Sequence, residues 1–239
     1  MAERIDLLAW DSSFFAQKVG RCTLAHPQQL PDLMHEAESR GYSLLYIESQ
    51  HILVGHCALP FSLLDVGGQI RYAKNLLPPQ QVPRPDAHIV SCSRHDLHGD
   101  VLSLAYLSGS LSRFRSDKNL PAGSFERLYR SWLLKTLERL STGAVYIYRV
   151  SGQPVGLITS EWDNGVCTIG LLAVHPSWQG QGIATRLIHH VESLCFQNDL
   201  RRLEVKTQLI NIGARALYAK NSFSESEQSR LYHAHILAR

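Results

Sequence analysis

The 239 residues suffice for one large domain or two small ones, because domains usually hold roughly 100 to 200 residues. Hydrophobic residues make up 44% and charged residues 19% of the chain, which is typical of globular proteins and excludes disordered and fibrous classes. The formal net charge of +3 comes from 24 basic and 21 acidic residues without a long run of like charge, so nothing indicates a nucleic-acid partner.

The cysteines and the amino terminus also exclude several classes. The five cysteines are odd in number and widely spaced, which predicts free thiols rather than a disulfide framework or a zinc site. The segment from Met1 to Asp6 has no apolar signal core, and no stretch approaches the roughly 20 apolar residues that cross a bilayer. We therefore expect a cytoplasmic protein with no bound metal and no membrane partner.

The first eighty residues indicate a small α/β unit. A helix is predicted from Pro31 to Arg40 because Gly41 follows it, and the apolar run from Tyr42 to Ile47 predicts a strand. The segment from Leu76 to Pro85 contains four prolines, which remove backbone donors and disfavour helix, so we interpret it as a linker. The predicted domains are residues 1–83 and residues 84–239.

The residues after this linker alternate between amphipathic helices and strands. Ser124 is predicted to cap a helix whose apolar residues follow a three-and-four spacing through Leu140, and Gly143 is predicted to end it. Turn signals at Gly152 and Gly165 separate three strand-like runs and predict an antiparallel meander. The predicted strands of the meander are 144–150, 155–162 and 166–174. The elements predicted after it are a helix at 182–196, a strand at 203–206, a helix at 214–220 and a strand at 229–237.

A glycine-rich stretch between the meander and the next helix predicts an anion site. The strand from Gly170 to Pro176 runs into the segment from Gln179 to Ala184, which has glycines at 180 and 182. Glycine lets the backbone approach a ligand closely, and the first amides of a helix have no partners inside it, so they attract phosphate. This stretch lacks the third glycine and the acidic residue of a dinucleotide-binding site. It also lacks the lysine of a P-loop.

The segment from Val174 to Pro176, followed by Gln179 to Ala184, resembles the Gln/Arg-x-x-Gly-x-Gly/Ala signature of GNAT acetyltransferases. The resemblance implies an α/β (α+β) fold with a mixed, mostly antiparallel sheet flanked by helices, and it implies acetyl-CoA as co-substrate. Backbone groups of Leu172, Ala173 and Val174 would bind the pantetheine arm. The residues implied to hold the pyrophosphate are Gln179, Gly180, Gln181, Gly182, Ile183, Ala184 and Thr185.

A second part of the same resemblance lies between Asn211 and Phe223, where an asparagine precedes a tyrosine by seven residues and Ser222 replaces a usual glycine. It implies that Asn211 touches the cofactor and that Tyr218 is the catalytic acid that protonates the departing CoA thiolate. A phenol suits this role because its pKa near 10 keeps it protonated at neutral pH. The acceptor of the amine proton stays open between a water chain and a carboxylate such as Glu161.

The rest of the chain carries a narrower resemblance to the TDP-fucosamine acetyltransferases. It implies a small amino-terminal α/β domain, a homodimer, and acetylation of the 4-amino group of a dTDP-linked 4-amino-4,6-dideoxy sugar for surface polysaccharide synthesis. Arg113 and Arg115 are then predicted to bind the phosphates of the nucleotide sugar, since guanidinium pairs with phosphate through two hydrogen bonds. Ala16 stands where glycine is expected. The residues that carry this resemblance are Trp10 to Phe15, Ser108 to Arg115 and Leu128 to Trp132.

Two other functions stay open at this point. One is a GNAT enzyme that acetylates a protein amino terminus, a lysine or a polyamine, and the other is a module that binds acetyl-CoA or a protein without catalysis. The twelve histidines, including His233 and His235, do not form a recognisable metal-ligand pattern, so we interpret them as solvated or hydrogen-bonded residues.

Overall fold

The computed structural model describes residues 5–54, 61–77, 86–139 and 142–236, and within them the strands form one ten-stranded sheet. The strand order is β1-β2-β3-β10-β4-β9-β8-β7-β6-β5. The strands are β1 (Asp6–Leu7), β2 (Val19–Leu24), β3 (Leu44–Ser49), β4 (Phe61–Asn75), β5 (Ile89–Ser91), β6 (Gly143–Val150), β7 (Gln153–Asp163), β8 (Val166–Val174), β9 (Arg202–Gln208) and β10 (Ser224–Ile236). The helices are α1 (Ala9–Phe15), α2 (Leu30–Ser39), α3 (Gly99–Ser108), α4 (Arg113–Ser116), α5 (Ser124–Glu138), α6 (Ile183–Gln197) and α7 (Ile212–Lys220).

The pairing confirms the predicted mixed, mostly antiparallel sheet. Two pairs are parallel, β2 with β3 and β8 with β9, and the other neighbouring strands are antiparallel. Each parallel pair is joined through a helix, because parallel neighbours need a crossover connection. The predicted meander corresponds to β6, β7 and β8.

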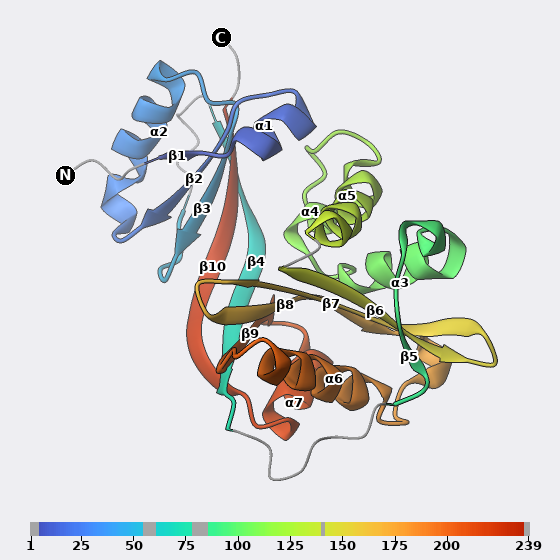
Figure 1. The fold of residues 1–239 in the computed structure, drawn as a ribbon. Coiled ribbons are helices and arrows are strands. Elements are labelled where there is room, and N and C mark those ends of the chain that lie inside the picture. Colours follow the sequence, from blue (N-terminus) through green and yellow to red (C-terminus); the bar gives the residue numbers. More distant parts are fainter. Residues whose placement is uncertain (1–4, 55–60, 78–85, 140–141, 237–239) are drawn as a thin grey trace.

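Two long strands connect the amino-terminal and carboxy-terminal parts of the molecule (Figure 1). β10 pairs with β3 on one side and with β4 on the other, and β4 then pairs with β9. The last strand of the chain therefore lies inside the sheet that the first eighty residues begin. Residues 78–85 of the predicted linker do not belong to the described part of the chain. The division between two domains at residue 83 therefore stays a prediction.

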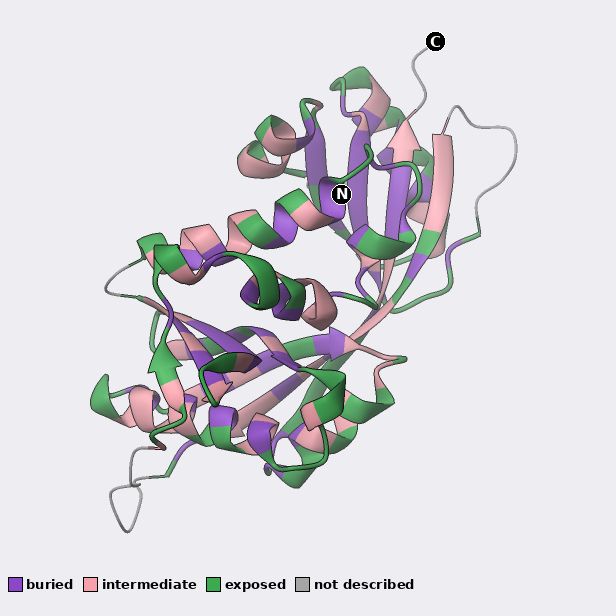
Figure 2. Ribbon diagram, turned by 90° about the vertical axis from the view of Figure 1, so that its right-hand side faces the viewer, coloured by how far each residue is buried: buried purple, intermediate pink, exposed green. Residues whose placement is uncertain are grey.

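Helices cover both faces of this sheet (Figure 1). α3 and α5 lie against β6, β7 and β8 on one face, α6 lies against the same strands on the other, and α2 covers the amino-terminal strands. Three clusters of buried apolar side chains fill the spaces between these layers. Figure 2 shows the result: buried strands lie between helices whose outer faces are exposed.

Two local predictions for α5 are wrong. Gly123, with φ 71°, precedes the helix in the N-cap position, and Ser124 is its first residue, whose hydroxyl accepts a hydrogen bond from Arg127 instead of capping an amide. The helix ends at Glu138 rather than at Gly143, because Gly143 begins β6 and pairs with Glu161. Leu140 lies outside the described residues.

Candidate active site

The site forms where β8 and β9 separate. In β8 this pairing runs from Val166 to Ile169 only, and a bulge of β8 follows, where Gly170 and Leu171 lie opposite Thr159 of β7. The Thr159 hydroxyl accepts a hydrogen bond from the Leu171 amide at 2.9 Å, which fixes the bulge. Beyond Ile169, the edge of β8 that faced β9 lacks a partner strand among the described residues and borders two adjoining pockets.

The first pocket, which we call the donor pocket, has a volume of about 470 Å³ and lies between the end of β8 and the amino termini of α6 and α7. Gly180 and Gly182 both have φ 77°, and a Cβ at either position would meet open space. Gly182 is the N-cap of α6 and offers no side-chain cap, so the first amides of α6 are free to bind an anion.

The structure brings together nearly all residues predicted to bind the cofactor. Gln179 also closes the turn, because its side-chain amide donates to the Val174 carbonyl at 2.9 Å. Gln181 is exposed and is not among the described residues that line the pocket. The predicted residues that do line it are Leu172, Ala173, Val174, Gln179, Gly180, Gly182, Ile183, Ala184, Thr185 and Asn211.

The second pocket, which we call the acceptor pocket, has a volume of about 300 Å³ and shares a wall with the donor pocket. Ten elements of the sheet and the helices contribute to it, and its charged lining residues are Arg21, Glu48, Arg113 and Lys206. The residues common to both pockets are Ser108, Leu172, Asn211 and Ala214.

α7 contributes Tyr218 to the acceptor pocket, and its N-cap residue Asn211 lines both pockets. The Asn211 side-chain oxygen caps the helix by accepting the Ala214 amide at 3.1 Å, which leaves the amide nitrogen of Asn211 for a ligand. Tyr218 lines the acceptor pocket, is 4% exposed, and packs against the rings of Tyr72 and Phe223. Its hydroxyl has no hydrogen-bond partner within the described ranges. Burial raises the pKa of Tyr218 well above its ordinary value, so the phenol stays protonated at neutral pH.

The two arginines predicted to bind phosphate have different surroundings. Arg113 lines the acceptor pocket, and its guanidinium lies 4.2 Å from the ring centroid of Tyr46. In the described part of the chain, Arg113 makes neither an ion pair nor a side-chain hydrogen bond. Arg115 is exposed, forms an ion pair with Glu126 at 3.0 Å, and lies outside the described lining of both pockets.

Residues 111–223 match the sequence model of the family described as "Acetyltransferase (GNAT) family". These residues, slightly less than half of the chain, are similar to GNAT acetyltransferases. The predictions of an acetyltransferase, of its fold and of acetyl-CoA as its acyl donor are thereby confirmed at the level of the family. The roles of the individual residues stay predictions.

One curated relative and several solved structures resemble this acetyltransferase. The spore coat polysaccharide biosynthesis protein SpsD of Bacillus subtilis (strain 168) is 23% identical over 133 residues, which cover 56% of this chain and 46% of SpsD. The chain thus matches less than half of that relative's length. A functionally unknown conserved protein from Staphylococcus epidermidis has a TM-score of 0.67 at 12% identity, covering 99% of this chain and 92% of that one. A GCN5-related N-acetyltransferase from Sphaerobacter thermophilus has a TM-score of 0.58 at 16% identity, covering 99% and 78%. These structural likenesses show a shared fold.

Several polar residues of the acetyltransferase's acceptor pocket escaped the sequence analysis. Arg21, Glu48, Gln69 and Lys206 come from four different strands, and no motif surrounds any of them. Glu161, the carboxylate considered for the amine proton, accepts hydrogen bonds from Thr136 and Arg139 and is not part of the described lining. The signal that could have found Arg21, Glu48, Gln69 and Lys206 is the convergence of separate strands, which is decided by the tertiary structure.

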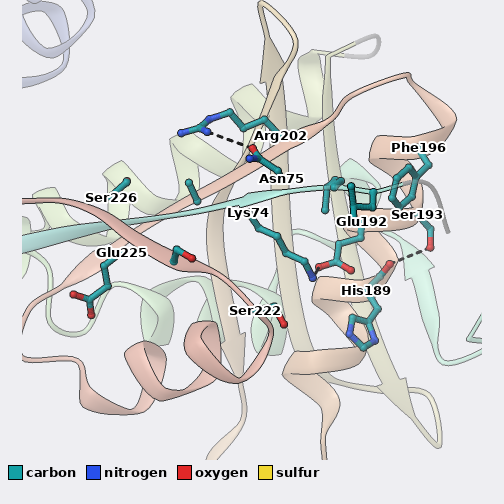
Figure 3. Close-up of a pocket in the computed structure, with 14 residues that line it drawn as sticks. Lys74, Asn75, His189, Glu192, Ser193, Phe196, Arg202, Ser222, Glu225 and Ser226 are labelled. Carbon is teal, nitrogen blue, oxygen red and sulfur yellow. Dashed lines mark hydrogen bonds and ion pairs between the residues drawn. The ribbon is translucent and has the colours of Figure 1, made fainter.

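A third cavity, of about 720 Å³, is larger than the donor and acceptor pockets and lies beside α6, β4 and the start of β10 (Figure 3). Lys74 and Glu192 point toward each other across it and form an ion pair at 2.6 Å, and Arg202 donates to Asn75. It shares no described lining residue with the donor or acceptor pocket. Because these charges are already paired, we assign the chemistry to the two adjoining pockets. No helix in the described ranges has the length and apolar character needed to cross a membrane.

Proposed function

We propose that this acetyltransferase transfers the acetyl group of acetyl-CoA to the 4-amino group of a dTDP-linked 4-amino-4,6-dideoxy sugar, for surface polysaccharide synthesis. The observation that carries the proposal is the Arg113 guanidinium, which lines the acceptor pocket without an ion pair within the described residues. Arginine that is held by aromatic rings and lacks a protein partner suits a phosphate group, which it can bind through two parallel hydrogen bonds.

The charge of the acceptor pocket supports the same class of acceptor. Arg21, Arg113 and Lys206 line it, and Glu48 is the one carboxylate among its described lining residues. A diphosphate-linked amino sugar carries more negative than positive charge, so it complements this set. A polyamine, which is wholly positive, does not. The partial similarity to a polysaccharide biosynthesis protein agrees with a sugar acceptor.

On the donor side, the free amides at the start of α6 would hold the pyrophosphate of acetyl-CoA, and the unpaired edge of β8 would hydrogen-bond the pantetheine arm. The thioester would then lie at the wall shared by the two pockets, near Leu172. A backbone amide of β8 there would stabilise the negative charge that develops on the thioester oxygen.

The chemistry then requires two proton transfers. The neutral amine of the sugar attacks the thioester carbon, the carbon–sulfur bond breaks, and the departing thiolate takes the proton of the Tyr218 hydroxyl. The attacking nitrogen loses one proton to water or to a pocket carboxylate, so that a neutral amide and CoA thiol leave. Tyr218 is protonated before each turnover because burial keeps its pKa high.

Glu48 is suited to hold the amino group of the acceptor. Its Oε1 accepts hydrogen bonds from Ser229 at 2.6 Å and from Gln69 at 2.9 Å, so the carboxylate is fixed while Oε2 has no partner in the described part of the chain. Burial raises the pKa of Glu48, but these hydrogen bonds and the charge of Lys206 outweigh it and hold the pKa below its usual range. An ionised Glu48 would attract the substrate ammonium to the pocket, and the ammonium would give one proton to water before the neutral amine attacks.

A thiol-release assay with acetyl-CoA tests the proposal. The acceptors are dTDP-4-amino-4,6-dideoxygalactose, its glucose epimer, a UDP-linked amino sugar, a peptide and spermidine. We expect rapid release with one dTDP sugar and background release with the peptide and spermidine. Thiol release with only the peptide or only spermidine would show that the acceptor is not a nucleotide sugar. No thiol release with any of these amines would favour a binding module without catalytic activity.

A further inference from the structure

Two histidines of β10 share one buried carboxylate. The Asp117 Oδ2 atom lies 2.6 Å from His233 Nδ1 and 2.8 Å from His235 Nε2, and the Asn119 amide donates to Asp117 Oδ1 at 2.9 Å. Asp117 and the His233 side chain are buried, and His235 is 12% exposed. These three residues line neither the donor pocket nor the acceptor pocket in the described ranges.

The distances favour hydrogen bonds over a metal ion. Ligand atoms held tetrahedrally at about 2.0–2.1 Å from zinc are about 3.3 Å apart, so both separations here are too short for neighbouring zinc ligands. A metal-bound imidazole usually donates its second N–H to a protein group. His233 Nε2 is buried without a partner among the described residues. Two imidazoles that each donate one N–H to the same carboxylate oxygen account for the geometry.

The carboxylate is attached directly to the helix that carries Arg113. Asp117 is the C-cap of α4, and its amide donates to the Arg113 carbonyl at 3.0 Å. α4 has four residues, too few for a helix that is stable without tertiary contacts. Hydrogen bonds from β10 to Asp117 therefore fix the position of this turn on the sheet.

Aromatic contacts also link His233 to Arg113. The His233 ring lies 4.7 Å from the Tyr46 ring and 6.1 Å from the Phe114 ring. The Arg113 guanidinium lies over the rings of Tyr46 and Phe114, at 4.2 Å and 4.7 Å from their centroids. Because Phe114 is part of α4 and moves with Arg113, a shift of α4 away from His233 and His235 would separate the Arg113 guanidinium from the Tyr46 ring.

We propose that Asp117, His233 and His235 form a clasp that positions the Arg113 guanidinium for the phosphate groups of the acceptor. They act through Arg113 and are positioning residues. The inference rests on the proposed function for the identity of the acceptor, and on the contacts of α4 for the effect on Arg113.

Substitution of His235 tests the clasp with a matched control. His235→Leu removes the donor to Asp117, whereas the Nε2 of Gln in His235→Gln can donate from a similar distance along the side chain. We expect His235→Leu to raise the KM for the dTDP amino sugar about fivefold to tenfold, with the KM for acetyl-CoA unchanged, and His235→Gln to restore most of the loss. Equal KM values in wild type and both variants would overturn the clasp.

The Arg113→Gln background separates positioning from a general structural effect. If the clasp acts through Arg113, His235→Leu has little further effect on the acceptor KM once Arg113 is replaced. The same fivefold to tenfold rise in both backgrounds would overturn the proposal. Stoichiometric zinc in the purified wild-type protein, with loss of acceptor affinity on chelation, would also overturn it in favour of a metal site.

A crystal structure of His235→Leu tests the clasp even if no nucleotide sugar is a substrate. We expect the Arg113 guanidinium to leave the Tyr46 ring in this variant and to stay there in His235→Gln. A guanidinium that keeps its place in both variants would overturn the clasp. Failure of the wild-type enzyme to use any nucleotide sugar would overturn the proposed acceptor and leave this structural test valid.

Discussion

The donor and acceptor pockets meet at Leu172 and Asn211 but are built in opposite ways. The donor pocket takes most of its lining from two short segments, 172–185 and 211–220, and offers mainly backbone groups to a ligand. The acceptor pocket takes one to three residues from each of ten elements and offers fixed charges. A backbone site suits a ligand that is the same for a whole family, whereas a side-chain site can change its ligand by substitution.

Tyr218 should give the largest effect, because the proposed function assigns it to the chemical step rather than to the binding of either ligand. Tyr218→Phe keeps the ring packing but removes the proton for the CoA thiolate, so we expect kcat to fall about a hundredfold to a thousandfold. The KM for acetyl-CoA should stay unchanged in steady-state assays. Unchanged turnover would remove Tyr218 from the mechanism.

Gly182 tests the backbone character of the donor pocket. At φ 77°, alanine strains the turn and places a methyl group where the pyrophosphate is expected. We expect Gly182→Ala to weaken acetyl-CoA binding by about 2 kcal/mol, or about thirtyfold, in calorimetry. Gly165→Ala is the matched control, because Gly165 has φ 80° in the turn between β7 and β8. Equal binding losses in both would show that strain alone is responsible.

The buried imidazole of His233 should make the stability of the protein depend on pH. Burial lowers the pKa of His233 to about 4, against about 6.5 in the unfolded chain. Between these values only the unfolded chain binds the proton, so the free energy of unfolding falls as the pH falls, by about 2 kcal/mol from pH 7 to pH 5.

Urea unfolding at both pH values checks this, with His233→Asn as the comparison. Asparagine keeps a donor near the position of Nδ1 but does not titrate. The hydrogen bonds from His233 and His235 outweigh burial and hold the pKa of Asp117 low, so Asp117 stays ionised over this range. The same pH dependence in wild type and variant would contradict the assignment to His233.

The two arginines test the side-chain character of the acceptor pocket. We expect Arg113→Gln to raise the acceptor KM about tenfold, which corresponds to about 1.4 kcal/mol, because one phosphate contact is lost. Arg115→Gln should change it less than about twofold, since Arg115 already pairs with Glu126 at the surface. The reverse order in steady-state kinetics would move the phosphate site to Arg115.

The smallest effect is expected at two turns in which a residue other than glycine has a positive φ. Ala16 has φ 51° and Ser222 has φ 63°, and these are the two positions at which the sequence departs from an expected glycine. Ala16→Gly and Ser222→Gly should each raise the free energy of unfolding by about 0.5 kcal/mol, because glycine adopts this conformation without steric cost. Destabilisation in denaturant titrations would show that the side chains contribute more than the strain costs.

The sequence by itself determined the donor pocket, the helices α6 and α7 and the meander of β6 to β8. Their signals are local: glycines beside a helix start, an asparagine seven residues before a tyrosine, and apolar periods that match a helix or a strand. At Ala16 and Ser222, where the family resemblance leads one to expect glycine, the backbone has a positive φ.

Tertiary structure alone decided the acceptor pocket and the surroundings of the two arginines. β4 was not predicted, because Gly67, Gly68 and its charged residues resemble a turn, and it is held by pairing with β9 and β10 on its two sides. His233 and His235 lack any pattern until β10 brings them to Asp117, more than a hundred residues earlier in the chain. Such sites depend on which distant strands become neighbours, and local sequence carries no record of that pairing.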